Sequence, residues 1–306
     1  MSYHVPVMVD EVVQGLVTNP GGLYLDVTVG GGGHSKAILQ TLQPAGRLVA
    51  IDRDVEAVQF ARQVFDQWSS QAEVLHAGFA ALGPLLKKRK IGAVHGVLFD
   101  LGVSSHQIDE PARGFSYQEE GPLDMRMDRQ QGVAAADIVK MSSEMDLAQI
   151  IKKYGEEFQA RRIARSICQF RRRGDLETTA DLRKAVEATN PRHLGKTLAR
   201  VFQAFRIVVN GELEQLEKGL EATINCLIPG GRLAVIAYHS LEDRLVKTRL
   251  AKLVKGCICP PDFPVCACGK TPQFKSTHRK AQRAGKEEVQ ANRRSRSAIL
   301  RIYEKI

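Results

Sequence analysis

Three acidic residues each stand at the end of a short apolar run, and a glycine-rich segment follows the first of them. Asp26 precedes four consecutive glycines, Gly30 to Gly33, and Asp52 and Asp100 end two further runs. Glycines let the backbone approach a ligand closely, and the start of the next helix offers free N–H groups. A carboxylate such as Asp52, which lies 19 residues beyond Gly33, can accept hydrogen bonds from both hydroxyls of an adenosine ribose. The pattern predicts a site for an adenosine-containing ligand.

The loop does not match a nicotinamide dinucleotide site. The pattern Gly-x-Gly-x-x-Gly fails in both registers, because Ser35 and Lys36 stand where the third glycine belongs. Asp26 before the loop suits a positively charged ligand better than a pyrophosphate. S-adenosylmethionine has an adenosine, a sulfonium and an amino acid tail but no phosphate, and we expect it as the cofactor. A purely structural glycine turn is disfavoured, because Asp52 and Asp100 end strands at the edge where such folds bind ligands.

Two more positions join this expected site. Asp100 opens the string Asp-Leu-Gly-Val-Ser-Ser after the fourth predicted strand. In such a fold this position faces the methyl donor and the group that accepts the methyl. Phe79 follows the third strand, where a ring can pack on adenine, and a place in the ordinary core is an equal alternative.

The elements that must position these residues alternate between strands and helices. Apolar runs predict strands at 23–27, 47–51, 73–76, 94–99, 232–238 and 297–303, with a turn at 229–231. Helical patterns cover 34–42 and 55–68 between the early strands, and 198–209 and 212–227 later. Such alternation predicts an α/β, Rossmann-like parallel sheet.

A helical insertion interrupts this pattern. After loop-like sequence from Pro111 to Arg129, we expect helices at 134–141, 143–154, 157–173 and 179–189, and Thr178 with Asp181 offers a capping start for the last. The expected organisation is a first part of the α/β domain at 1–109, a helical insertion at 110–197 and a second part of the α/β domain, with the basic segment 270–301, at 198–306.

Composition excludes several classes of protein. The chain has 306 residues, a net charge of +10 and 43% hydrophobic residues, which excludes a disordered, collagen-like or disulfide-scaffold chain. No apolar run reaches the roughly 18 to 20 residues of a membrane helix, and no signal peptide is visible. We expect a cytoplasmic protein with no membrane partner.

Most of the positive charge lies near the C-terminus. Segment 270–301 holds ten Lys and Arg against Glu287 and Glu288, which is +8 of the +10. Because 297–303 should return to the sheet, we expect a tethered basic loop that binds nucleic acid rather than a free, solvated tail. A second basic face lies on the insertion, where either a solvated helix surface or RNA contact explains Arg161, Arg162, Arg165 and Arg171 to Arg173.

Motifs spread over nearly the whole chain resemble one family, the ribosomal RNA small-subunit methyltransferase H family, also called MraW. The strings that carry the resemblance are His4-Val-Pro-Val-Met, Asp26-Val-Thr-Val-Gly-Gly-Gly-Gly-His-Ser, Asp100-Leu-Gly-Val-Ser-Ser, Arg113-Gly-Phe-Ser, Gly121-Pro-Leu-Asp-Met-Arg-Met-Asp, Tyr154-Gly-Glu-Glu, Phe202-Gln-Ala-Phe-Arg-Ile, His239-Ser-Leu-Glu-Asp-Arg and Arg294-Ser-Arg-Ser-Ala.

The resemblance implies S-adenosylmethionine-dependent N4-methylation of one cytidine in 16S rRNA near the decoding centre. The implied partner is 16S rRNA within the small ribosomal subunit, and a homodimer stays open. At Gly31 the family often has a larger residue, frequently Arg. The implied donor-binding residues are Gly32, Gly33, His34, Asp52, Phe79, Asp100 and Gln107.

The cytosine amine is a poor nucleophile, because its lone pair is delocalised into the ring. The implied chemistry therefore needs a group that accepts hydrogen bonds from the amine protons. By analogy with other amino-methyltransferases, Asp100 or the backbone after it is the best-placed acceptor and the expected catalytic residue. Those enzymes usually carry Asp/Asn-Pro-Pro-aromatic, whereas this chain has Asp-Leu-Gly-Val. A structural ion-pair cluster and a role near the substrate explain five further features equally well: His239, Asp243, Arg244, Arg113 and the stretch Asp124–Asp128.

Four cysteines form a compact cluster in a proline-rich loop: Cys257, Cys259, Cys266 and Cys268. They could close a tetrahedral zinc site, but Cys-x-Cys departs from the usual Cys-x-x-Cys, so reduced thiols are the leading expectation and no metal is assigned. Cys168 and Cys226 lie on apolar helix faces and are expected in the core.

Three hypotheses of function remain distinct: an rRNA cytidine N4-methyltransferase, a methyltransferase for a small molecule or protein, and a non-enzymatic RNA-binding ribosome assembly factor that retains the fold. The first is the leading one.

Overall fold

The computed structural model describes residues 6–174, 176–257, 259, 265 and 268–306 of the chain. These residues form two compact units. The first holds the residues up to Gly102 together with Leu213–Ile306, and the second holds Val103–Glu212. No helix within the described ranges is long and apolar enough to cross a membrane.

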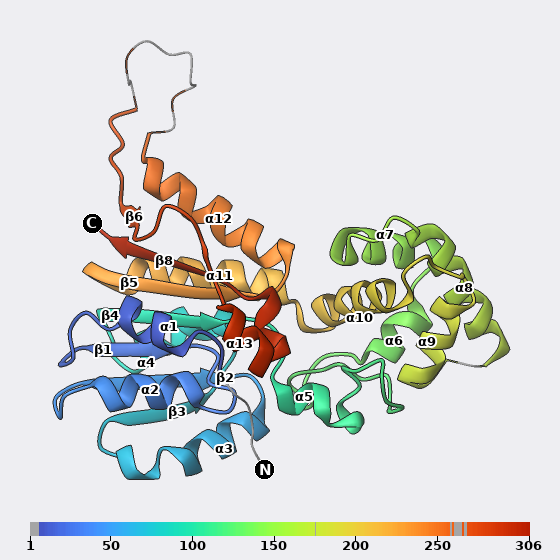
Figure 1. The fold of residues 1–306 in the computed structure, drawn as a ribbon, viewed down its shortest axis with the longest axis horizontal. Coiled ribbons are helices and arrows are strands. Elements are labelled where there is room, and N and C mark those ends of the chain that lie inside the picture. Colours follow the sequence, from blue (N-terminus) through green and yellow to red (C-terminus); the bar gives the residue numbers. More distant parts are fainter. Residues whose placement is uncertain (1–5, 175, 258, 260–264, 266–267) are drawn as a thin grey trace. The chain divides into compact units, whose positions relative to one another are not determined.

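The first unit is built on one eight-stranded sheet with the order β3-β2-β1-β4-β5-β8-β6, in which β7 pairs with β8 (Figure 1). Strands β1 to β5 run parallel to one another, and β8 runs antiparallel to β5, β6 and β7. The strands are β1 (Leu23–Asp26), β2 (Arg47–Asp52), β3 (Ala72–His76), β4 (Val94–Asp100), β5 (Leu227–Ala237), β6 (Phe274–Ser276), β7 (Gln282–Arg283) and β8 (Ile299–Lys305). The order reverses between β1 and β4, the switch point at which doubly wound sheets bind ligands. The predicted Rossmann-like fold class is confirmed.

Helices cover both faces of the sheet. One core joins it to α1 (Val9–Leu16), α2 (Gly33–Thr41) and α3 (Val55–Val64). A second core joins the opposite face to α4 (Leu82–Lys88), α11 (Glu212–Cys226) and α12 (Ser240–Lys255). Within β4 the side chains alternate between the cores, because Leu98 packs in the first while Val97 and Phe99 pack in the second.

Two local predictions for this unit are wrong. The expected turn at 229–231 is an irregularity inside β5, since the pairing with β4 jumps from Leu227 to Arg232. The helix expected over 55–68 ends at Val64 and is followed by a short 3-10 turn, η1 (Asp66–Trp68). A second such turn, η2 (Phe79–Ala81), leads into α4.

The basic segment 270–301 also differs from expectation. The predicted return to the sheet is confirmed by β8, but the segment before it is more than a loop. It contains β6, β7, α13 (Lys286–Ala291) and η4 (Arg293–Ser297). Pairing of β6 and β7 with β8 holds this segment along the sheet edge.

The second unit is helical. It contains α5 (Ser105–Asp109), η3 (Pro111–Arg113), α6 (Ala135–Met141), α7 (Glu144–Gly155), α8 (Ala160–Arg173), α9 (Thr179–Glu187) and α10 (Leu194–Asn210). Helices α6 to α10 pack around one apolar core. The capping start predicted at Thr178 is confirmed: its hydroxyl accepts from the Asp181 N–H, and the Asp181 carboxylate accepts from the Thr178 N–H.

This unit is longer than the segment 110–197 expected for the insertion. Helix α10 packs on α6, α7 and α9, and its Val201 and Phe205 are fully buried in the helical core. The expected start of the second methyltransferase part at residue 198 falls inside that helix. The packing of one continuous amphipathic helix moves the boundary to Glu212.

Candidate active site

The glycine loop connects β1 to α2 at the switch point of the sheet. Gly30 and Gly32 have φ of 48° and 75°, the left-handed region that favours glycine. A Cβ at Gly32 would lie 3.0 Å from the Phe65 ring, and one at Gly33 would lie 2.7 Å from the Pro6 ring. Gly32 is also the N-cap of α2, with no side-chain cap bond. The loop therefore brings bare backbone to the start of a helix.

The end of β1 contributes a fully buried carboxylate. One oxygen of Asp26 accepts from the Thr28 N–H at 3.0 Å, and the other accepts from the Ser35 hydroxyl at 2.6 Å. Burial raises the pKa of Asp26, and the nearby charge of Asp100 raises it further. Its bonds fasten the first turn of α2 to the strand end.

Asp52, at the end of β2, is turned toward the glycine loop. Its Oδ2 accepts from the Gly30 N–H and its Oδ1 from the Asp54 N–H, both at 2.9 Å. Burial raises the pKa of Asp52 to about 6, against the effect of these two bonds, and the charges of Asp54 and Asp26 add to the rise. Mutual repulsion of carboxylates at these strand ends favours a positively charged ligand.

Asp100, at the end of β4, has a partner on each oxygen. Its Oδ1 accepts from the Tyr238 hydroxyl at 2.9 Å, and its Oδ2 lies 3.4 Å from His34 Nδ1. Tyr238 follows directly after β5, and its phenol pKa is raised by burial and by the Asp100 charge. Sequence reasoning missed Tyr238; the signal available was its position at the end of a strand parallel to β4.

His34 is held between two acceptors. Its Nε2 lies 2.8 Å from the Val7 carbonyl oxygen, so this nitrogen carries the proton. Nδ1 can then donate to Asp100 only when the ring is an imidazolium. Burial lowers the pKa of His34, but the hydrogen bond and charge of Asp100 outweigh it, and the net shift is upward. When the ring is protonated, the site contains an ion pair between the buried histidine and a carboxylate that is 13% exposed.

The His-Ser-Leu-Glu-Asp-Arg string fixes the chain that carries Tyr238. Glu242, which is 3% exposed, accepts from the Tyr238 N–H at 2.9 Å and lies 3.1 Å from the His239 ring. Asp243 binds Arg301 of β8 with contacts of 2.6 and 3.0 Å. These charges hold the start of α12 against the sheet, which supports the structural alternative for His239 and Asp243.

Comparison with known proteins covers the chain from end to end. The model of the MraW methylase family matches residues 1–306. The chain belongs to the MraW methylase family. Ribosomal RNA small subunit methyltransferase H of Symbiobacterium thermophilum is 46% identical, over 99% of this chain and 97% of its own. The proteins of that name from Geobacter sp. and Heliobacterium mobile are 44% and 45% identical, each over 99% of both chains.

A more distant likeness is found among solved structures. An rRNA methylase from Streptococcus thermophilus has a TM-score of 0.42 and 12% identity, over 97% of this chain and 93% of that one. The fold class rests on the strand order described above. Membership in a methylase family supports S-adenosylmethionine as the cofactor, as expected from the loop.

The site residues fit this methylase cofactor. Carboxylates that raise one another's pKa suit a cationic sulfonium ligand, and glycines with no Cβ leave backbone open to it. The structure places the loop, His34, Asp52 and Asp100 at one edge of the sheet, at the ends of β1, β2 and β4.

Phe79 lies beyond β3 at the start of η2. Its half-buried ring packs edge-on against Phe99, with centroids 5.8 Å apart, and its Cβ would lie 3.0 Å from a Cβ added at Gly219. These contacts place the base of the ring in the core, and stacking on adenine stays a prediction.

Gln107 belongs to the second unit. It is buried in α5, where its side chain accepts from the Ser104 N–H at 3.1 Å and closes a capping box. Its role toward the donor stays a prediction.

Arg113 and the stretch Asp124–Asp128 are bonded to each other inside the second unit. Arg113 is 2% exposed and donates to the Arg126 and Met127 carbonyls. Asp124 pairs with Arg126 at 2.7 Å. This pairing lowers the pKa of Asp124, although burial raises it. This geometry supports the ion-pair alternative over closure on a substrate base.

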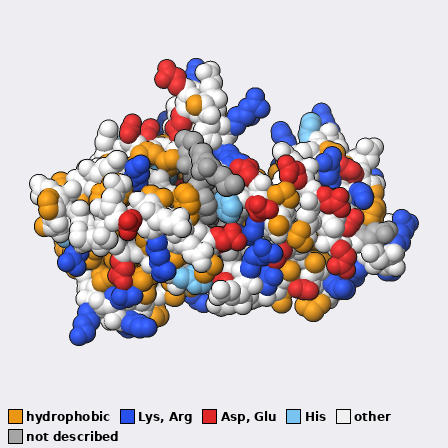
Figure 2. Space-filling view, turned by 90° about the horizontal axis from the view of Figure 1, so that it is seen from below, with side chains coloured by type: hydrophobic (Ala, Val, Ile, Leu, Met, Phe, Trp, Pro, Cys, Tyr) orange, Lys and Arg blue, Asp and Glu red, His pale blue; other side chains and the backbone are white. Residues whose placement is uncertain are grey.

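The second basic face is partly structural. Arg171 donates to the Val139, Lys140 and Ser142 carbonyls at the end of α6, and Arg165 faces Glu144 at 3.4 Å. Arg161, Arg162, Arg172 and Arg173 are exposed. On the face drawn in Figure 2, Lys and Arg side chains are mixed with Asp and Glu.

The basic segment of the first unit presents more exposed charge. Lys275 and Arg301 are paired with Glu304 and Asp243. Its other exposed cations are Lys270, Arg279, Lys280, Arg283, Lys286, Arg293 and Arg296.

Proposed function

We propose that this methylase transfers a methyl group from S-adenosylmethionine to N4 of one specific cytidine in 16S rRNA, near the decoding centre and within the small ribosomal subunit. The hydrogen-bonded trio of His34, Asp100 and Tyr238 beside the glycine loop carries the proposal. The names of relatives at 44 to 46% identity support ribosomal RNA as the substrate.

Asp100 is the proposed catalytic residue. When bound, S-adenosylmethionine supplies an electrophilic methyl group on a sulfonium. A carboxylate that accepts a hydrogen bond from the N4 amine increases the electron density on nitrogen as the C–S bond breaks and the N–C bond forms. The amine proton then leaves to Asp100 or to water. Tyr238 and His34 hold the carboxylate in place.

The donor is proposed to contact the loop and the neighbouring strand ends. Asp52 accepts from the ribose hydroxyls, Phe79 lies against the adenine, and the backbone of the loop follows the amino acid tail. The full proposed donor set is Gly32, Gly33, His34, Asp52, Phe79, Asp100 and Gln107.

Exposed cations of the basic segment are proposed to bind the ribosomal RNA backbone. β6 and β7 hold them on the sheet edge, which reduces the entropy lost on binding compared with a free tail.

The test uses small subunits from cells that lack the modification. They are incubated with the protein and methyl-labelled donor, and the labelled nucleotide is mapped. We expect one labelled cytidine carrying N4-methyl in 16S rRNA. Label on another atom would refute the N4 assignment. Label only in a small acceptor would favour a different methyltransferase, and binding of S-adenosylhomocysteine without any transfer would favour an assembly factor.

An Asp100→Ala variant tests the catalytic assignment. We expect methylation to be abolished while the far-UV circular dichroism spectrum is unchanged. The matched control is Asp66→Ala, because Asp66 is exposed in η1. Turnover by Asp100→Ala at the control's rate would remove Asp100 from the mechanism.

A further inference from the structure

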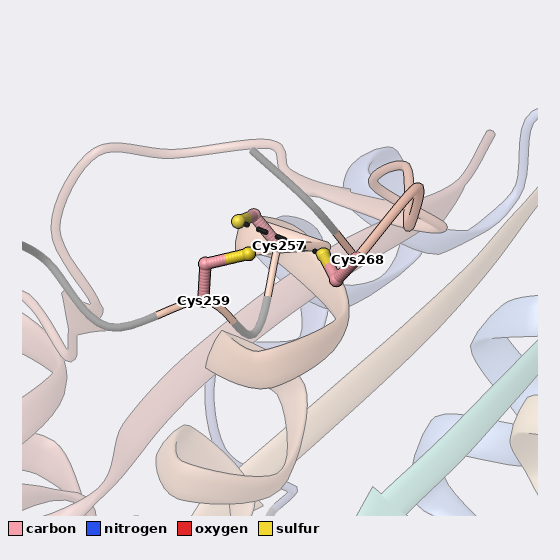
Figure 3. Close-up of side chains that lie close together, drawn as sticks. All are labelled: Cys257, Cys259 and Cys268. Carbon is pink, nitrogen blue, oxygen red and sulfur yellow. Dashed lines mark hydrogen bonds between the residues drawn. The ribbon is translucent and has the colours of Figure 1, made fainter. Parts of the chain in front are cut away.

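Three cysteine side chains converge where the chain leaves α12. The sulfurs of Cys257, Cys259 and Cys268 all lie within 4.8 Å of one another, and those of Cys257 and Cys268 are 3.7 Å apart (Figure 3). Each residue is partly exposed. Cys266, the fourth cysteine of this sequence cluster, lies outside the described residues, so the described cluster consists of three thiols.

The distances suit one metal ion. In a tetrahedral site with Zn–S bonds of about 2.3 Å, two sulfurs stand about 3.8 Å apart. The 3.7 Å between Cys257 and Cys268 corresponds to one edge of such a tetrahedron. An iron–sulfur cubane binds each cysteine through a different iron and therefore needs its sulfurs further apart.

The chain on both sides of the thiols is already held together. Gln273 N–H donates to the Leu253 carbonyl at 2.9 Å, so the residues that lead into β6 are bonded to the last turn of α12. A Cβ at Gly256 would lie 2.4 Å from the Pro272 nitrogen, so the two backbones touch there. Little further ordering is needed to bring the sulfurs around an ion, which favours binding.

The surrounding charge also suits metal-bound thiolates. Lys252 and Lys255 lie in the last turn of α12, and Lys270 follows Cys268 by two residues. A zinc ion bound by three thiolates carries net negative charge, which cations this near in the sequence favour.

We propose that Cys257, Cys259 and Cys268 bind a structural zinc ion that pins the start of the basic segment to the end of α12. The site is remote in sequence from the glycine loop and does not depend on the proposed function.

Metal analysis tests the site. The protein is purified without chelators or metal-affinity resin, kept reduced, and supplied with zinc before desalting. We expect about one zinc per chain for the wild type. The zinc content of the double variant Cys257→Ser/Cys268→Ser should be at least about tenfold lower, because it lacks two of the three proposed ligands. The control is Cys226→Ala, because Cys226 is buried in the core of the first unit, where its thiol donates to the Thr223 carbonyl, and is not part of the cluster; this variant should retain the zinc.

Cobalt substitution keeps the test valid if the double variant does not fold. Reduced wild-type protein with Co²⁺ should show the intense visible bands of tetrahedral cobalt and a thiolate-to-cobalt charge-transfer band. Wild-type protein without stoichiometric zinc, cobalt spectra without thiolate bands, or bound iron with sulfide would each overturn the proposal. So would an unchanged zinc content in a folded double variant.

Discussion

Replacing Asp52 with Asn removes a charge while keeping the size of the side chain. Burial and the charges of Asp54 and Asp26 raise the pKa of Asp52 from 3.8 to about 6. Between these values the folded protein holds a proton that the unfolded chain has lost, so stability falls as pH rises through the folded pKa. At about 1.4 kcal/mol per pKa unit, the wild type loses about 3 kcal/mol of its free energy of unfolding over this range.

The measurement is urea unfolding of both proteins between pH 4 and pH 7.5. The free energy of unfolding of Asp52→Asn, minus that of the wild type, should increase by about 2 to 3 kcal/mol across this range. Asn can still accept from one of the two N–H groups at Gly30 and Asp54, and the lost bond shifts the whole curve by only about 1 kcal/mol. The control Asp66→Asn changes an exposed carboxylate and should run parallel to the wild type.

The affinity for the donor should decrease in Asp52→Asn, although this variant gains stability relative to the wild type as the pH rises. If Asp52 binds the ribose, Asp52→Asn loses a charged hydrogen bond of about 1.5 to 3 kcal/mol, and calorimetry should show donor affinity reduced by tenfold or more. Parallel stability curves for Asp52→Asn and wild type would refute the electrostatic reasoning. Unchanged donor affinity would refute the ribose contact.

Three more perturbations test individual contacts and charges. Tyr238→Phe removes the hydroxyl bond to Asp100 and should reduce methylation by about 10- to 100-fold with unchanged circular dichroism, in line with a charged hydrogen bond; an unchanged rate would exclude a positioning role. Gly32→Ala should lower the free energy of unfolding by about 1 to 2 kcal/mol and weaken donor binding, because φ is 75° and the new Cβ meets Phe65, and equal stability in urea would contradict this. Neutralising three exposed cations, Arg279, Lys280 and Arg283, should weaken binding to small subunits and reduce the slope of log K against log salt by about 2. The affinity for the donor should not change. An unchanged slope would show that the RNA binds another surface.

Local patterns predicted β1 to β5, β8, α2, α3 and α11 of the first unit and part of its site, but not α1, α4, α12 or α13. The apolar runs before Asp26, Asp52 and Asp100 became β1, β2 and β4, because strands buried on both faces need continuous apolar sequence. The same reasoning failed at Pro229–Gly231, where β5 continues through an irregularity that pairing with β4 stabilises. It also missed β6 and β7, which are too short to show alternation and depend on β8 for their hydrogen bonds.

The sequence by itself determined the parallel sheet, the glycine loop and the acidic strand ends, because hydrophobic period and glycine spacing are local properties. Only the tertiary structure decided which side chains meet. Tyr238 reaches Asp100 across 138 residues because β5 pairs beside β4. Arg113 donates to a backbone carbonyl within the second unit, because a buried guanidinium needs hydrogen-bond acceptors. The sulfurs of Cys257 and Cys268 lie close together because Gly256, which has no Cβ, allows its backbone to approach that of Pro272.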